Sequence, residues 1–402
     1  MACMDDMEVD SPVTVQRPTA GPEWTDHKRW LWLLGLLVPL LPFIGWRSAQ
    51  ATGLGILWWT GPIVVFGVIP ILDVAFGLDR ESPPDEVLAR LEADRYYRWC
   101  TYLYLPLQYA GLVLACWLWT RGDLPLLDQL GLAITVGCVT GIGINAAHEL
   151  GHKKQSGERW LSRIALAPTG YGHFYIEHNR GHNVRVATPP DPASARLGES
   201  FWAFLPRTVA GSVASAWRLE RKRMNRRGLR WWSIQNDIVS AWLMTLTLVT
   251  GLTVAFGPGL LPWFAVQAVF GFCLLEVVNY LEHYGLCRQR SADGRYERVR
   301  AEHSWNSDNI TTNVLLYHLQ RHSDHHANPT RRYQALRSLD QAPNLPAGYA
   351  AMILAAWVPP LWRRVMDPRV LAHYGGDVTR ANISPRRRSR LLATYGKRSE
   401  AA

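Results

Sequence analysis

The sequence predicts an all-α integral membrane protein with about six transmembrane helices and a histidine-rich cap on the cytosolic side. Three observations support this fold class. Apolar residues fall into six long runs within the 402 residues, and a helix that crosses a bilayer needs about 20 mostly apolar residues. Basic residues are concentrated between those runs. The 19 Trp and 15 Tyr residues suit the aromatic belts of a bilayer interface.

The predicted spans form three pairs, each joined by a short turn with few charges. They cover residues 30–46 and 52–76, 99–120 and 124–147, and 238–256 and 260–281. The longer connections carry most of the Arg and Lys residues, which favour the cytosolic side of a membrane. We therefore expect a multi-pass protein of the bacterial inner membrane, with both termini and both long polar segments in the cytosol.

Composition narrows the classes of function. The chain has 43 Lys and Arg against 33 Asp and Glu, a net charge of +10. Because these basic residues lie between the spans, we attribute the charge to membrane topology and expect no nucleic-acid binding. The six cysteines form no C-x-x-C pair, so neither a disulfide framework nor a zinc ribbon nor an iron–sulfur site is predicted.

The predicted organisation has three parts. Residues 1–29 are acidic and then Pro/Thr-rich, which predicts a disordered cytosolic tail rather than a signal peptide. Residues 30–374 form the six-helix bundle with its cytosolic cap, and residues 375–402 form a basic tail. The apolar stretches 201–205 and 350–362 are too short to cross a bilayer, so we expect interfacial helices there, or half-buried helices of the cap.

Histidines carry the chemistry. Eight of the 13 fall into four compact groups at predicted span ends or in the polar segments. Residues three or four apart share one face of a helix, so the groups with several histidines can aim two or more imidazoles at one point. Because all four groups lie on one membrane side, we expect them to converge on a metal site. The eight are His148, His152, His178, His182, His283, His322, His325 and His326.

Several kinds of metal protein use histidine. His148-Glu149-x-x-His152 fits the zinc protease pattern with Glu149 as general base, but a catalytic zinc takes three protein ligands, and eight histidines exceed that number. A haem protein would place histidine pairs within the spans, and a metal transporter would need polar ligands at mid-depth. Two metal ions with about four ligands each account best for the set.

At these motifs the chain resembles the membrane alkane monooxygenases (alkane 1-hydroxylases), over residues 30–374. The matching strings are HELGHK from His148, EHNRGH from Glu177, NYLEHYGL from Asn279 and LQRHSDHHANPTRRYQ from Leu319. The resemblance implies a di-iron site held by the eight histidines, O2 as co-substrate and an n-alkane hydroxylated at its terminal carbon. It also implies electrons from a rubredoxin, itself reduced by an NAD(P)H-dependent reductase.

One position departs from the family pattern. The family has a further ligand histidine after EHNRGH, where this chain has Asn183. Asn183 is either a weak oxygen ligand or a polar residue behind the ligands. His173, His303 and His318 lie near the motifs and are expected to support the site or to pack elsewhere. A metal-bound histidine usually donates its outer N–H to an acceptor, and the candidates are Glu149, Glu177, Glu282, Asp191, Asp324 and Asn279.

We expect two further features, an apolar channel for the substrate and a basic surface for lipid or for the electron carrier. An apolar channel between the spans would lead from the bilayer to the irons, because alkanes partition into lipid. The basic stretch 218–230 would either bind anionic lipid or dock an acidic electron carrier. A related di-iron desaturase or hydroxylase that acts on another apolar chain remains the alternative enzyme, and an intramembrane zinc protease remains the alternative from another class.

Overall fold

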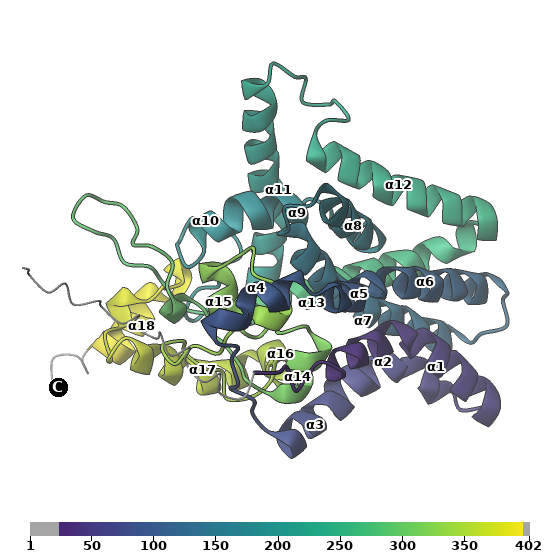
Figure 1. Cartoon of the computed structure of the whole chain (residues 1–402), viewed down its shortest axis with the longest axis horizontal. Coiled ribbons are helices and arrows are strands. Elements are labelled where there is room, and N and C mark those ends of the chain that lie inside the picture. Colours follow the sequence, from purple (N-terminus) through teal and green to yellow (C-terminus); the bar gives the residue numbers. More distant parts are fainter. Residues whose placement is uncertain (1–23, 397–402) are drawn as a thin grey trace, which may run out of the picture.

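The computed structural model describes residues 24–396, and these are helical apart from turns and loops. Within this described part of the chain, six helical segments are long and apolar enough to cross a membrane, which confirms the predicted number. They are Leu31–Thr52, Gly55–Phe76, Arg95–Thr120, Leu126–Gly151, Asp237–Phe256 and Pro258–His283. In Figure 1 the spans extend to the right and the cap, built from the segments between and after them, lies to the left.

Three of the spans contain irregular turns. The first joins η1 (Leu31–Leu36) to α1 (Leu37–Thr52), and the third joins α5 (Arg95–Tyr102) to α6 (Tyr104–Thr120). The second consists of η2 (Gly55–Trp59), α2 (Thr60–Ile63), η3 (Val64–Val68) and α3 (Ile69–Phe76). The remaining spans are α7 (Leu126–Gly151), α12 (Asp237–Phe256) and α13 (Leu261–His283), the last preceded by η6 (Pro258–Leu260).

Helix α7 is the centre of the bundle and is buried along most of its length. It packs closely against α13, since small residues let the two backbones approach each other. A Cβ atom built on Gly141 would lie only 2.8 Å from the carbonyl oxygen of Gly271 on α13. The contact between α7 and α13 fixes the two helix ends that carry His148 and His283.

The cap is made of the helices between and after the spans, most of them short. They are α4 (Asp85–Ala93), α8 (Ser156–Leu166), η4 (Ala167–Thr169), α9 (Phe174–Glu177), η5 (His178–His182), α10 (Asn183–Arg185), α11 (Phe201–Arg226), η7 (Ala301–His303), α14 (Ile310–Leu315), α15 (His322–Ala327), η8 (Tyr333–Ala335), α16 (Tyr349–Trp357), α17 (Pro359–His373), η9 (Val378–Arg380), η10 (Pro385–Arg387) and α18 (Arg388–Tyr395).

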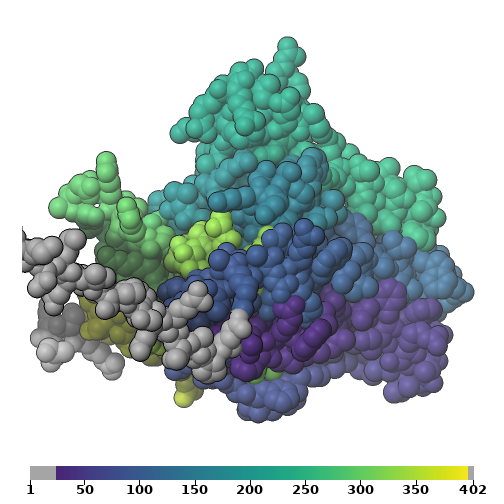
Figure 2. Space-filling model, in the orientation of Figure 1, coloured from purple at the N-terminus to yellow at the C-terminus, as the bar shows by residue number. Residues whose placement is uncertain are grey.

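The sequence predicts a short helix at residues 201–205. In the structure this stretch is instead the start of the 26-residue helix α11. Its buried side chains recur every three or four residues, but many of them are small or polar, among them Thr208, Ser212 and Ser215. A hydropathy reading therefore misses the continuation. Figure 2 shows the chain around the end of α11 as a ridge at the top of the molecule.

The stretch 350–362 divides into α16 and α17 at Val358. Pro359 and Pro360 have no backbone N–H to donate, and a residue before proline is kept out of the helical region. Val358 accordingly has φ −110° and ψ 89°. This break turns the chain away from the bundle and along the cap (Figure 1).

Both expected tails are partly packed. Most of the first, residues 1–23, lies outside the described residues, but Asp26 accepts hydrogen bonds from the Trp32 indole and the Tyr97 hydroxyl. Of the second, residues 397–402 lie outside the described residues, whereas Ile383 and Leu391 are buried in the core of the cap. Isolated apolar residues in a basic segment gave no periodic signal from which this packing could be predicted.

Candidate metal centre

The four histidine stretches converge at the junction of the bundle and the cap. His148 and His283 occupy the last turns of α7 and α13, and His152 directly follows α7. His178 and His182 begin and end the wide turn η5, while α15 carries the other three histidines. Helix ends from two packed spans and two cap segments therefore meet at one place, as the sequence predicts.

The eight histidines form two buried groups of four. In each group one ring nitrogen per residue lies within 4.8 Å of the corresponding nitrogen of every other member. The first group is His148, His152, His178 and His325, and the second is His182, His283, His322 and His326. Each group combines histidines from at least three chain segments, so the fold rather than one local motif creates it.

The ring nitrogens fit a cation at each group. Nε2 of His148 faces Nε2 of His178 at 2.9 Å, and Nε2 of His152 is buried with no hydrogen-bond partner. The second group repeats the pattern, because Nε2 of His322 faces Nε2 of His326 at 2.9 Å and Nε2 of His283 has no partner. Buried nitrogens without partners are costly, and imidazole is a good ligand for Fe, Zn or Cu.

The cap histidines are held in the neutral form that binds metal. Burial lowers the pKa of His152 and His178 well below the usual value, and nearby imidazoles lower it further. The same causes lower the pKa of His322, His325 and His326. A neutral imidazole keeps a free lone pair on one nitrogen, which is what coordination requires.

Asp191 supports the second group from behind. Its Oδ2 accepts a hydrogen bond from Nδ1 of His182 at 2.9 Å and another from Oγ of Ser194 at 2.6 Å. Burial alone would raise the pKa of Asp191, but the charge interaction and hydrogen bond with His182 hold it below the usual value. This contact matches the expected role of Asp191, since it leaves Nε2 of His182 as the free nitrogen.

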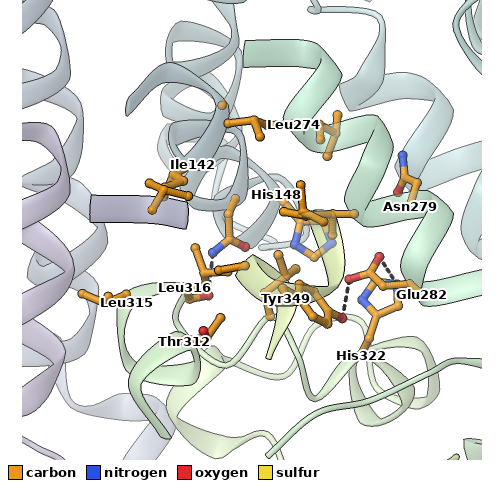
Figure 3. Close-up of a pocket in the computed structure, with 18 of the residues that line it drawn as sticks. Ile142, His148, Leu274, Asn279, Glu282, Thr312, Leu315, Leu316, His322 and Tyr349 are labelled. Atoms are coloured by element: carbon orange, nitrogen blue, oxygen red, sulfur yellow. Dashed lines mark hydrogen bonds and ion pairs between the residues drawn. The ribbon is translucent and has the colours of Figure 1, made fainter. Parts of the chain in front are cut away.

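Glu282 takes a different place from the one expected. Its Oε2 lies 3.1 Å from Nε2 of His322, the nitrogen that faces into the group, and its Oε1 accepts a hydrogen bond from the Tyr349 hydroxyl at 2.9 Å. Figure 3 shows this carboxylate between the His322 ring and Tyr349. Glu282 therefore borders the metal-facing side of the second group rather than its outer side.

The other acidic candidates have partners outside the groups. Glu149 forms an ion pair with Lys153 at 2.9 Å, Glu177 with Arg185 at 2.6 Å, and Asp324 with Arg331 at 2.7 Å. Asn279 donates to Glu276 at 3.3 Å. The Glu149–Lys153 ion pair does not suit a general base at a zinc site, which must be free to accept a proton.

The three additional histidines do not join either group. Nδ1 of His318 lies 2.9 Å from the carbonyl oxygen of Tyr333, and the ring packs edge-on against Trp32. His303 pairs with Glu297 at 3.4 Å, in a separate cluster with Glu302. The His173 ring packs on Tyr171. Their closeness in sequence to the motifs does not bring them into the site.

Asn183 directly follows His182 and opens α10. Its Oδ1 is buried and has no hydrogen-bond partner. A buried amide oxygen with unused lone pairs, on the residue next to His182, fits either of the two roles that the sequence leaves open.

A narrow apolar cavity of about 70 Å³ leads to the histidines. Its walls include Ile69 of the second span, Ile142 of α7 and Leu274 of α13, so it lies between spans, and His148 and His322 line it as well (Figure 3). Tyr349 and Thr312 also line it. Sequence analysis missed both residues, because neither belongs to a metal-binding pattern.

These features define a helical membrane protein with paired histidine groups, and comparison with known proteins agrees. A family model described as fatty acid desaturase matches residues 129–356. An alkane 1-monooxygenase of Acinetobacter baylyi is 46% identical over 92% of this chain and 92% of its own length. Enzymes with the same name from Ectopseudomonas oleovorans (94% of this chain, 95% of its own) and Pseudomonas putida (94% of each) are 45% and 44% identical. The chain belongs to the alkane 1-monooxygenase family.

Proposed function

We propose that the protein hydroxylates n-alkanes at the terminal carbon, with O2 as co-substrate and two irons held by the eight histidines. The observation that carries this proposal is the division of the histidines into two buried groups of four beside an apolar cavity between the spans. The activity for which these relatives are named agrees with it. A single zinc would leave one complete group of four without a function.

Two bound irons would supply the redox chemistry that an unactivated C–H bond requires, because no side chain can break such a bond by acid–base catalysis. In the first group His148, His152, His178 and His325 would hold one ion, and in the second His182, His283, His322 and His326 would hold the other. Asp191 would fix the ring of His182 in the orientation that presents Nε2.

The cavity orients the substrate. Leu274, Ile142 and Ile69 offer only apolar contacts, so an alkane that enters from the bilayer loses no hydrogen bond and exchanges one apolar environment for another. A narrow slot favours an extended chain that enters end-on, which would direct a terminal carbon towards His148 and His322. The same walls exclude water from the reacting end.

The reaction of an alkane with O2 to give an alcohol and water consumes two electrons and two protons. We propose a rubredoxin as electron donor, reduced in turn by an NAD(P)H-dependent reductase. Glu282 and Tyr349, hydrogen-bonded to each other beside His322, are the polar pair on the cavity wall that can hold a proton near the reacting carbon. We place the protein in the bacterial inner membrane with both termini in the cytosol, in accord with its basic connections.

The test combines metal analysis with product analysis on the purified full-length protein. We expect about two Fe per chain, and 1-alcohols from a mixture of n-alkanes with O2, rubredoxin and reductase. The H152N variant should lose iron and activity, whereas H373N, which lies outside both groups, should retain them. An alkene product would identify a desaturase, and one Zn per chain without alkane turnover would exclude the di-iron site and favour the zinc-protease alternative; either result would refute the proposal.

A further inference from the structure

A second cavity, of about 510 Å³, lies away from the histidines, between the start of α11, the first turns of α17 and residues 384–387. Five arginines line it, and we call it the arginine pocket. They are Arg196, Arg207, Arg363, Arg386 and Arg387. Glu199 is the one acidic residue in the lining.

The arginines outnumber the carboxylates near them. Asp367 interacts electrostatically with Arg363 and Arg387, and Glu199 does so with Arg196, so five cations share two carboxylates. Arg207 is neutralised by Glu199 through two contacts of 2.8 Å. Among residues 24–396, no carboxylate oxygen lies within 4.0 Å of the guanidinium of Arg196, Arg363, Arg386 or Arg387. Guanidinium groups that share a cavity repel one another unless an anion lies between them, and their planar forks bind phosphate oxygens in pairs.

The pocket opens beside an apolar surface. Trp202 is 56% exposed, Val358 50% and Leu361 45%. The indole of Trp202 donates a hydrogen bond to the carbonyl oxygen of Trp357 at 3.0 Å, which joins α11 to α16. Helix α16 packs against the spans α13 and α3. An exposed Trp beside spans and next to arginines is typical of the boundary between lipid and water.

We propose that the arginine pocket binds the phosphate of an anionic phospholipid, whose acyl chains lie along Trp202, Val358 and Leu361. The unpaired guanidiniums supply the charge and geometry for the phosphate, and the exposed apolar side chains supply the contact for the tails. An acidic protein would complement the charge but would leave the apolar rim uncovered, so the lipid fits both halves of the surface.

A bound lipid would also steady the loop that supports the metal centre. Arg196 and Glu199 belong to the same loop as Asp191, the acceptor for His182. That loop is tied to the end of α13 by a hydrogen bond from the Gly285 amide to the carbonyl oxygen of Ala195 at 3.0 Å. Backbone hydrogen bonds of Leu197 with Asn382 and Ser384 already join this loop to the C-terminal segment. Phosphate bound between Arg196 and residues 384–387 would add a further link, so lipid binding should raise the thermal-unfolding midpoint.

The experiment measures lipid retained by the full-length protein in native mass spectrometry, after reconstitution in mixtures of phosphatidylcholine and phosphatidylglycerol. The pocket variant is R363Q/R387Q. The matched control is R364Q/R388Q, which removes the same charge from the neighbouring exposed residues that do not line the pocket. A soluble arm adds glycerol 3-phosphate, which has the phosphate without the tails. Lipid retention and thermal unfolding depend on neither iron nor turnover, so these two readouts are independent of the proposed function.

We expect wild type and control to retain phosphatidylglycerol in preference to phosphatidylcholine and to unfold at a higher temperature with it. The pocket variant should bind it roughly tenfold more weakly for each charge-assisted contact removed. Equal retention by all three proteins would overturn the proposal. So would displacement of the lipid by glycerol 3-phosphate at equal concentration, which would assign the pocket to a soluble phosphate. Unchanged lipid retention with weaker reduction by an acidic carrier would assign it to protein docking.

Discussion

Asp191 Oδ2 lies 2.9 Å from Nδ1 of His182, and this contact determines which nitrogen of the ring faces the second histidine group. The Asp191 side chain is almost fully buried and also accepts from Ser194. The contact therefore links the loop after α10 to the geometry of the candidate metal centre, and it suggests the first of five tests.

The D191N variant should weaken iron binding at the second group. An amide at this position no longer provides a charged acceptor for the His182 N–H, and the loss of such a partner costs roughly 10–100-fold in metal affinity or activity. Iron per chain and its rate of loss to a chelator measure the effect. D340N, at an exposed carboxylate, is the control. Unaltered iron retention in D191N would contradict a supporting role for Asp191.

The N183H variant should hold iron more tightly than wild type. Asn183 follows His182 and has a buried Oδ1 without a partner, so an imidazole there can supply one more nitrogen to the second group. We expect loss of iron to a chelator to slow by roughly tenfold, with a changed Mössbauer spectrum for one of two irons. N179H, one turn earlier in η5, is the control. Identical spectra for N183H and wild type would place residue 183 outside the ligand sphere.

A large side chain at Leu274 should shorten the alkanes that the protein accepts. Leu274 of α13 lines the cavity between the spans, and a ring in a narrow slot blocks the far end of a long chain. We expect L274W to retain activity on short alkanes while activity on long ones falls by roughly tenfold or more. Gas chromatography of products from a mixed-alkane reaction gives the profile. L246W, on the exposed face of α12, should keep the wild-type profile; a matching shift there would contradict the channel.

The metal-free protein should lose stability as the pH falls below about 6.5. Burial lowers the pKa of His152, His178, His322, His325 and His326 from their usual 6.5, so the unfolded chain takes up protons before the folded chain does. The stabilisation is complete above pH 6.5 and is lost as the pH falls towards the folded values, by roughly 1.4 kcal/mol per pH unit for each histidine. Unfolding midpoints in denaturant from pH 8 to 5 test this; a midpoint that is constant or rises on acidification would contradict it.

The sequence predicts which neighbouring histidines lie on one helix face. It does not predict which histidines from different segments share a group. The four-residue spacing of His148 and His152 predicts a shared helical face, and the structure confirms that they lie in one group. The division of α15 is different, because His325 joins the first group while His322 and His326 join the second. That division depends on which rings of α15 lie against His148 of α7 and which lie against His283 of α13, and no local pattern encodes it.

The fold shows the same limit. Long apolar runs predict the six spans because hydropathy alone decides insertion. Helix α11 is longer than the sequence predicts. Ser212 and Ser215 lie on its buried face, but they are too polar to extend an apolar run. Tyr349 was missed altogether. Its contact with Glu282 joins residues 67 positions apart, and only the folded chain brings them together.

The fifth test concerns the basic end of α11. The structure separates its cations: Arg223 is held by Glu220, which also pairs with Arg180, whereas Arg221 and Lys222 are exposed. Trp231 and Trp232 are about half exposed nearby, and this combination of cations with Trp favours anchoring to anionic lipid. R221E/K222E should therefore weaken binding to anionic vesicles.

Two readouts separate the lipid role from carrier docking. If the basic end of α11 anchors the cap to lipid, R221E/K222E should leave the rate of reduction by rubredoxin within about twofold of wild type at physiological salt, where screening acts over about 8 Å. If it docks the carrier, that rate should fall by 10-fold or more and the loss should shrink as salt rises, because steering by opposite charges is salt-sensitive. R364E/R388E, at exposed arginines outside both the end of α11 and the arginine pocket, is the control with the same change of charge. A fall in rate in R221E/K222E alone, at unchanged vesicle binding, would identify the end of α11 as the carrier's landing surface and contradict the lipid role.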